Sequence, residues 1–329
     1  MGGGRWDDHV YASYTSDRKS KGIADFAYSH ATASMDADDR KAHALLDPMG
    51  LKMRESRDSD EHPTSRAVIV ALDVTGSMST IPGIVQQKLP KLMGLITAKG
   101  GLEHPHLMTM AIGDSPCGDT VPLQVGQFES DIRIDEQIRS LFLEGGGGGT
   151  LEESYNLALY VAARKTSIDC WEKRREKGYM FLMGDEKAYR TTTAKELKKI
   201  FGDGVDGQVT DVDIETLVAE TLEKYEVFFI WPTAGASNSH SKSIRNFWSG
   251  LFGQRVLDLE DPTLVTELIA TTIATNEGVE IDDLGLDAHA KGVVGKALAH
   301  YTGGSAVAKK AKVDGTLAPV EGGGGSTRL

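Results

Sequence analysis

Three short segments of the sequence carry oxygen-bearing side chains of the kind that bind hard divalent cations. The first segment, 73–79, reads Asp-Val-Thr-Gly-Ser-Met-Ser, with a carboxylate and two hydroxyls at alternate positions. The second places a threonine directly after five glycines, and the third is Gly-Asp-Glu at 184–186. Oxygen ligands without thiolate or imidazole suit Mg²⁺ or Mn²⁺, with Ca²⁺ as an alternative. The candidate metal ligands are Asp73, Thr75, Ser77, Thr150 and Asp185.

Two of these segments follow stretches that the hydrophobic pattern predicts to be buried strands. Asp73 ends the apolar run 67–72, and Asp185 comes after a second apolar run, 179–183. Continuous apolar runs of this length are typical of strands covered on both faces of a parallel sheet. Because the carboxyl ends of parallel strands meet at one edge of the sheet, the two aspartates are expected at the same edge.

Strands and helices alternate along about 210 residues. This alternation predicts an α/β fold, a doubly wound, mostly parallel and Rossmann-like sheet with helices on both faces. Pro90 is expected to kink or split the first helix. The remaining strands are predicted over 107–112, 121–128, 227–231 and 256–257, and the helices over 84–96, 132–142, 151–163, 194–201, 214–225, 244–251 and 262–274.

Other acidic residues near the three segments have structural interpretations. Glu152 and Glu153 fall in the predicted first turn of helix 151–163, where carboxylates interact favourably with the helix dipole, and tuning of the metal is the alternative for them. Asp114 follows the predicted strand 107–112 and is interpreted first as a turn residue, with a role as an acceptor behind the metal ligands as the alternative.

The three segments together resemble the metal-ion-dependent adhesion site, or MIDAS, of von Willebrand factor A domains. The matching pattern is Asp-x-Thr-x-Ser after a first buried strand, a threonine after a glycine-rich loop, and an aspartate after a later strand. The order also matches, with 77 positions from Asp73 to Thr150 and 35 more to Asp185. The resemblance covers about 66–275 and is to the intracellular type found in prokaryotes and phages.

The resemblance implies a function in binding rather than catalysis. Thr75, Ser77 and Thr150 would bind the cation directly, and Asp73 and Asp185 would act mostly through bound water. An Asp or Glu carboxylate of a partner protein would fill the open coordination position. Intracellular proteins of this kind often work beside AAA+ ATPases, which makes such an ATPase the first partner to expect.

Two departures from the family pattern bear on the geometry of this site. The family usually has serine where this chain has Thr75, which keeps the hydroxyl. The glycine run before Thr150 is unusually long, so this ligand is expected to be mobile without a bound partner.

Two alternatives stay open at this stage. The segment Asp73-Val74-Thr75-Gly76-Ser77 also resembles the phosphorylation motif of haloacid-dehalogenase-type phosphoryl transferases, in which Asp73 would be the nucleophile and Asp185 would hold Mg²⁺. Simple phosphatases of that class need a second acid where Thr75 stands, and the transporters that carry threonine need membrane spans. The other alternative is an A-type domain with no metal, which would act as a scaffold.

Composition narrows the partners and the compartment. The chain has 329 residues and a net charge of −12, which argues against broad binding to nucleic acid or to an anionic membrane surface. No apolar run approaches the length of a membrane-spanning helix, and the first residues do not resemble a signal peptide. The two cysteines give no disulfide framework and are expected to be reduced thiols. A cytoplasmic protein is therefore expected.

The flanks of the predicted domain lack sustained periodicity. Residues 1–65 are interpreted as an arm, partly irregular, with one short helix over 38–46. Residues 66–275 form the A-type domain. Residues 276–329 are interpreted as a mobile tail with a short helix over 288–301, and they contain a run of glycines at 322–325.

Overall fold

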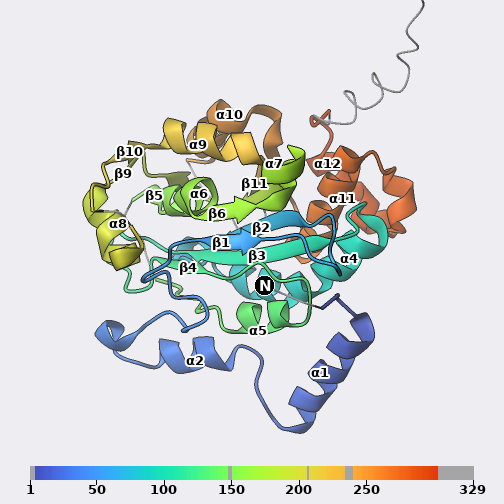
Figure 1. Cartoon of the computed structure of the whole chain (residues 1–329), viewed down its shortest axis with the longest axis horizontal. Coiled ribbons are helices and arrows are strands. Elements are labelled where there is room, and N and C mark those ends of the chain that lie inside the picture. Colours follow the sequence, from blue (N-terminus) through green and yellow to red (C-terminus); the bar gives the residue numbers. More distant parts are fainter. Residues whose placement is uncertain (1–3, 147–149, 206, 234–239, 303–329) are drawn as a thin grey trace, which may run out of the picture.

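A six-stranded sheet forms the centre of the molecule (Figure 1). The computed structural model describes residues 4–146, 150–205, 207–233 and 240–302. The predicted α/β fold with a mostly parallel central sheet is confirmed. In spatial order the strands are β12 (Val256–Leu259), β11 (Tyr225–Pro232), β7 (Gly178–Met183), β2 (Arg66–Asp73), β3 (Pro105–Ile112) and β4 (Leu123–Val125).

The chain winds this sheet outward from its centre in two directions. It starts at β2, moves to β3 and to the edge strand β4, and then returns to the other side of β2 to add β7, β11 and β12. Only β4 is antiparallel to its neighbour. The direction of winding reverses between β2 and β7, where Leu72 is in register with Met183. Crevices that bind ligands in such sheets lie at this reversal, beyond the carboxyl ends of the strands.

Alternate residues of β2 point into two separate hydrophobic cores. Ala67, Ile69 and Ala71 belong to one core and Val68 and Val70 to the other. The first core is closed by α6 (Tyr155–Arg164), α7 (Asp169–Arg174), α8 (Ala194–Phe201), α9 (Ile214–Lys224) and α10 (Ser241–Phe252). The second is closed by α3 (Ile81–Lys88), α4 (Leu92–Lys99), α5 (Arg133–Arg139), α11 (Val265–Glu277) and α12 (Ala288–Ala297).

Most of the predicted elements are present, with shifted ends. The helix predicted over 84–96 is divided into α3 and α4 by a 3-10 turn that contains Pro90, as expected. The strand predicted over 121–128 is much shorter, because only β4 pairs with β3. The 3-10 turns are η1 (Ala37–Asp39), η2 (Gly76–Met78), η3 (Leu89–Lys91), η4 (Gly202–Gly204), η5 (Gly253–Arg255), η6 (Pro262–Leu264) and η7 (Ile281–Leu284).

The predicted position of Glu152 and Glu153 in a helical first turn is wrong. The two residues form β5 (Glu152–Glu153), which pairs in parallel with β8 (Lys187–Ala188), and α6 begins only at Tyr155. Backbone pairing with the segment after Asp185 therefore overrides the helical pattern. A second small pair joins β9 (Thr191–Thr192) and β10 (Val212–Asp213).

The prediction of a helix over 38–46 is also wrong, because only the 3-10 turn η1 lies there. The region instead contains α1 (Asp8–Ser20) and α2 (Ala27–Ala33). Asp7 caps α1 by accepting from the amides of His9 and Val10. No residue of α1 is buried, so this helix carries no apolar stripe that the sequence pattern could reveal.

Both flanks of the predicted domain contact its core. The strand β1 (Arg54–Ser56) pairs in parallel with β6 (Thr166–Ile168), and α12 buries Val293 and Val294 in the second core. The domain boundaries at 65 and 275 stay a prediction. The glycine run 322–325 lies outside the described residues. Within the described part of the chain, no helix is long and apolar enough to cross a membrane.

A buried carboxylate, Asp169, ties the segment after β1 to α7. It lies 2.8 Å from Arg57 and 2.7 Å from Lys173, and it accepts from the amide of Asp58 at 2.8 Å. Burial raises the pKa of Asp169, but the bonds from Lys173, the Asp58 amide and Arg57 outweigh burial and lower this pKa to about 2.

We expect Asp169→Asn to reduce the free energy of unfolding by about 1.5–3 kcal/mol at neutral pH, since charge-assisted hydrogen bonds are lost. A carboxylate with a lowered pKa stabilises the fold above its unfolded pKa, and this contribution disappears as pH falls towards 2. Urea unfolding measured from pH 7 to pH 2 should therefore show the two proteins converging at low pH. The exposed Asp203→Asn is the control, and a constant gap down to pH 2 would contradict the assignment.

Candidate metal site

Asp73 stands at the carboxyl end of β2 with both carboxylate oxygens engaged. Its Oδ1 accepts from the Thr75 amide at 2.8 Å and from the Thr75 hydroxyl at 2.6 Å, and its Oδ2 accepts from the Tyr155 hydroxyl. The side chain is fully buried. An added Cβ at Gly184 would lie 1.7 Å from the Tyr155 hydroxyl oxygen, so this glycine leaves the space through which Tyr155 reaches Asp73.

Ser77 connects this group to the loop after β7. Its Oγ lies 3.2 Å from the Thr75 Oγ1 and donates to the Asp185 Oδ1 at 2.9 Å. Thr75 and Asp185 are buried, whereas Ser77 is exposed. The structure therefore brings four of the five predicted ligands into one hydrogen-bonded row, Asp73–Thr75–Ser77–Asp185, that opens to solvent at Ser77.

Thr150 has other partners. Its hydroxyl donates to the Glu152 carbonyl oxygen at 2.9 Å and lies 3.2 Å from the Tyr189 hydroxyl. Tyr189 in turn donates to the Asp114 Oδ1 at 2.9 Å. Among the described residues, no hydrogen bond joins Thr150 to the row of four. Its predicted role as a metal ligand stays a prediction.

The glycine run nevertheless lies against the loop after β2. The Gly76 amide donates to the Gly146 carbonyl oxygen at 2.6 Å, and the Gly145 amide donates to the Val74 carbonyl oxygen at 3.0 Å. An added Cβ at Gly76 would lie 3.0 Å from the Gly145 carbonyl oxygen, so the close approach of the two loops needs a glycine there. The rest of the run, 147–149, lies outside the described residues.

Further carboxylates surround the row. Sequence reasoning offered a role in tuning the metal for Glu153 only as an alternative, and it assigned none to Glu186. Burial, and then the charges of Asp73 and Asp114, raise the pKa of Glu153 to about 10. Burial, and then the charges of Asp185 and Asp73, raise the pKa of Glu186 to about 7. Both have an Oε2 that is buried without a hydrogen-bond partner. Their positions beside Thr150 and Asp185 in sequence were the only signal available.

No cationic side chain of the described residues neutralises the two aspartates of the row. Burial, and then the charge of Asp185, raise the pKa of Asp73 to about 7, and burial raises that of Asp185. Across the described ranges, no Lys, Arg or His forms an ion pair with either aspartate. An uncompensated pair of buried carboxylates joined by two hydroxyls fits a hard divalent cation, for which carboxylate and hydroxyl oxygens are suitable ligands.

Histidine and cysteine do not contribute to such a site. Within the part of the chain that the structure describes, no three His, Cys, Asp or Glu side chains are grouped to hold a metal ion. A cation held here would therefore depend on the hydroxyls of Thr75 and Ser77 together with the two aspartates. This donor set favours Mg²⁺ or Mn²⁺ over Zn²⁺, which prefers nitrogen and sulfur.

Comparison with known proteins gives distant structural likenesses only. No family model and no curated protein matches the chain. The pilus adhesin SpaC from Lactobacillus rhamnosus GG, in its open conformation, aligns with a TM-score of 0.43 and 12% identity over 68% of this chain and 31% of that chain. A von Willebrand factor type A protein from Catenulispora acidiphila aligns with a TM-score of 0.38 and 15% identity over 65% and 43%.

A third similar structure is the proximal thread matrix protein 1 from the mussel byssus. It aligns with a TM-score of 0.39 and 12% identity over 67% of this chain and 48% of that chain. The matched regions thus span 31% to 48% of the lengths of these proteins.

We expect Gly184→Ala to disturb the Tyr155–Asp73 contact and to lower the free energy of unfolding by about 1–3 kcal/mol, because a methyl group would overlap a buried ring. Chemical denaturation provides the measurement. Gly83→Ala is the matched control, since Gly83 lies in α3 with open space around its added Cβ. Alanine there should be neutral or stabilise by up to about 1 kcal/mol. Equal effects of the two substitutions would contradict the role of Gly184.

Proposed function

We propose that this protein is a metal-dependent interaction module of the von Willebrand A type. A divalent cation, Mg²⁺ first and Mn²⁺ or Ca²⁺ as alternatives, would be held by the hydroxyls of Thr75 and Ser77, with Asp73 and Asp185 acting mostly through bound water. It would supply a positive charge that attracts an anionic oxygen ligand. The observation that carries the proposal is the hydrogen-bonded row of two hydroxyls between two uncompensated carboxylates at the switch point.

The ligand of this cation would be an Asp or Glu carboxylate of a partner protein. Three members of the row are buried and Ser77 is exposed, so a partner can reach the cation only from the side of Ser77. A hard divalent cation binds carboxylate oxygen strongly, whereas it gains little from apolar groups. An AAA+ ATPase is the partner class that the sequence resemblance suggests. A reducing compartment such as the cytoplasm is consistent with Cys117 and Cys170, which are free thiols.

A catalytic role receives no comparable support. In a phosphoryl transferase Asp73 would attack phosphorus, which requires a free and reachable carboxylate oxygen. Here the side chain is fully buried, and both of its oxygens accept hydrogen bonds from Thr75 and Tyr155. We therefore propose a binding function and no enzymatic activity.

The metal site can be tested by calorimetric titration of Mg²⁺ and Mn²⁺. We expect one cation per chain in the wild type and at least a tenfold weaker affinity, about 1.4 kcal/mol, in Ser77→Ala and Asp185→Asn. Thr80→Ala is the control, because Thr80 is exposed beside the same loop and its side chain makes no capping bond. Including Thr150→Ala shows whether that hydroxyl joins the cation.

Two outcomes would redirect the proposal. If the wild type binds neither cation, the metal-dependent function is wrong and the domain is a metal-free scaffold. If Asp73→Asn abolishes binding while Ser77→Ala and Thr150→Ala leave it intact, the hydroxyl row is irrelevant, and hydrolysis of p-nitrophenyl phosphate should be measured to test phosphoryl transfer.

The open ligand position can be tested with acetate as the carboxylate probe. We expect acetate to lower the water-proton relaxation enhancement of protein-bound Mn²⁺, because a carboxylate displaces metal-bound water. Acetamide is a neutral control of similar shape and should have little effect. The titration is run at saturating protein so that free Mn²⁺ does not contribute. An equal response to both probes would show that carboxylate selectivity is absent.

A further inference from the structure

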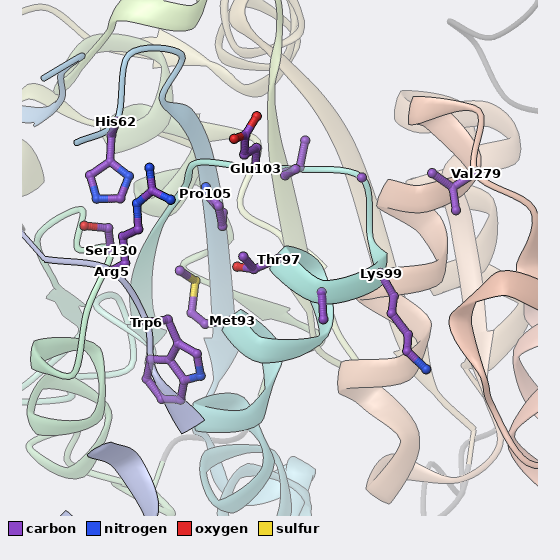
Figure 2. A pocket seen from close by; sticks show the side chains of 13 residues that line it. Arg5, Trp6, His62, Met93, Thr97, Lys99, Glu103, Pro105, Ser130 and Val279 are labelled. Atoms are coloured by element: carbon purple, nitrogen blue, oxygen red, sulfur yellow. The ribbon is translucent and has the colours of Figure 1, made fainter. Parts of the chain in front are cut away.

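A cavity of about 590 Å³ lies at the sheet edge opposite to the candidate metal site. Its wall includes Pro105, the first residue of β3, whereas Asp73 is the last residue of the parallel neighbour β2. Cavities of 300–1,000 Å³ are the usual size of sites for small molecules. Figure 2 shows that Arg5 and Trp6 of the segment before α1 form part of its wall.

The guanidinium of Arg5 in this wall has unused binding capacity. The Arg5 Nη2 donates to the Glu61 carbonyl oxygen at 2.9 Å, and no carboxylate among the described residues forms an ion pair with Arg5. His62 is 2% exposed, its Nε2 lies 2.9 Å from the Gly4 carbonyl oxygen, and its Nδ1 is buried without a partner. Because the Nε2 donates to the Gly4 carbonyl oxygen and the Nδ1 has no accessible surface, His62 shapes the wall and the anion is left to Arg5.

The remaining wall combines apolar surface with little negative charge. Trp6 and Met93 lie next to Arg5 in the cavity (Figure 2), and they offer a flat ring and a thioether to an apolar ligand. Glu103 is the one carboxylate in the described wall, and its side chain is 80% exposed, so solvent screens its charge. In a chain of net charge −12, this cavity is thus locally favourable to an anion.

We propose that this cavity is a binding site for a small organic anion, with one carboxylate or phosphate group on a flat apolar body. Arg5 pairs with the anionic group, since its guanidinium fits the oxygens of either group. Trp6 and Met93 contact the apolar body. This site is independent of the proposed metal-dependent function.

Ligand binding is coupled to the docking of the amino-terminal segment. The Gly4 carbonyl oxygen accepts from the Ser130 hydroxyl at 2.7 Å and lies against His62, so the residue before Arg5 is held by the cavity wall itself. A ligand that contacts both Arg5 and Met93 of α4 adds a second connection between this segment and the body of the protein. Amide exchange in α1 should therefore slow when the cavity is filled.

The test uses the full chain with benzoate and phenyl phosphate as probes and benzamide as the neutral counterpart of benzoate. Binding is followed by the indole N–H resonance of Trp6, which is identified with Trp6→Phe. We expect at least one anion to shift this resonance saturably, Arg5→Gln to weaken its binding about tenfold or more, and benzamide to bind far more weakly. Arg175→Gln is the matched control, because Arg175 is an exposed arginine next to a tryptophan, Trp171, but lies outside the cavity.

The outcomes separate the sources of the anion. Selective binding of benzoate assigns the site to carboxylates, and selective binding of phenyl phosphate assigns it to phosphate esters. Slower exchange in α1 with the bound probe supports the coupling to the amino-terminal segment. The proposal is overturned if neither anion shifts the Trp6 resonance, if benzamide binds as well as benzoate, or if Arg5→Gln binds the anion like the wild type and Arg175→Gln.

Discussion

Parallel pairing of β2 with β7 is the constraint on which the rest of the structure depends. The strands are separated by about a hundred residues, yet they lie side by side, and the winding of the sheet reverses between them. This reversal sends the chain away from the crevice on both sides and leaves the loops after the two strands facing each other. The contact between Ser77 and Asp185 is a direct result of this pairing.

The carboxylates at this edge raise an energetic question that the fold alone does not answer. Burial and the charges of neighbouring acids raise the pKa of Asp73 and of Glu186 to about 7 and that of Glu153 to about 10, because both effects disfavour the charged forms. Acids whose pKa is raised by burial and by neighbouring charges cluster at functional sites. A cation that binds only the folded chain would relieve the repulsion between these acids. Its binding would stabilise the fold by mass action.

The sequence predicted the parts of this structure whose signal is local. Strands β2 and β7 are apolar throughout because both of their faces are buried, and the aspartates that follow them were recognised from this position. The short pair β5 and β8 was missed because its two-residue strands carry no period and depend on a partner more than thirty residues away. The exposed helix α1 was missed because it buries nothing. The hydrogen bond between Thr150 and Tyr189 could not be predicted because it depends on a tertiary contact between two loops.

The distance along the chain between β2 and β7 also has a consequence for folding kinetics. Contacts between residues far apart in sequence close large loops and form late, whereas α3, α4 and the β2–β3 pair involve nearer neighbours. The Ser77–Asp185 contact can exist only after that late step. The row of four side chains can therefore form only once β7 lies beside β2, and chains stalled before β7 docks would contain the first loop without the second.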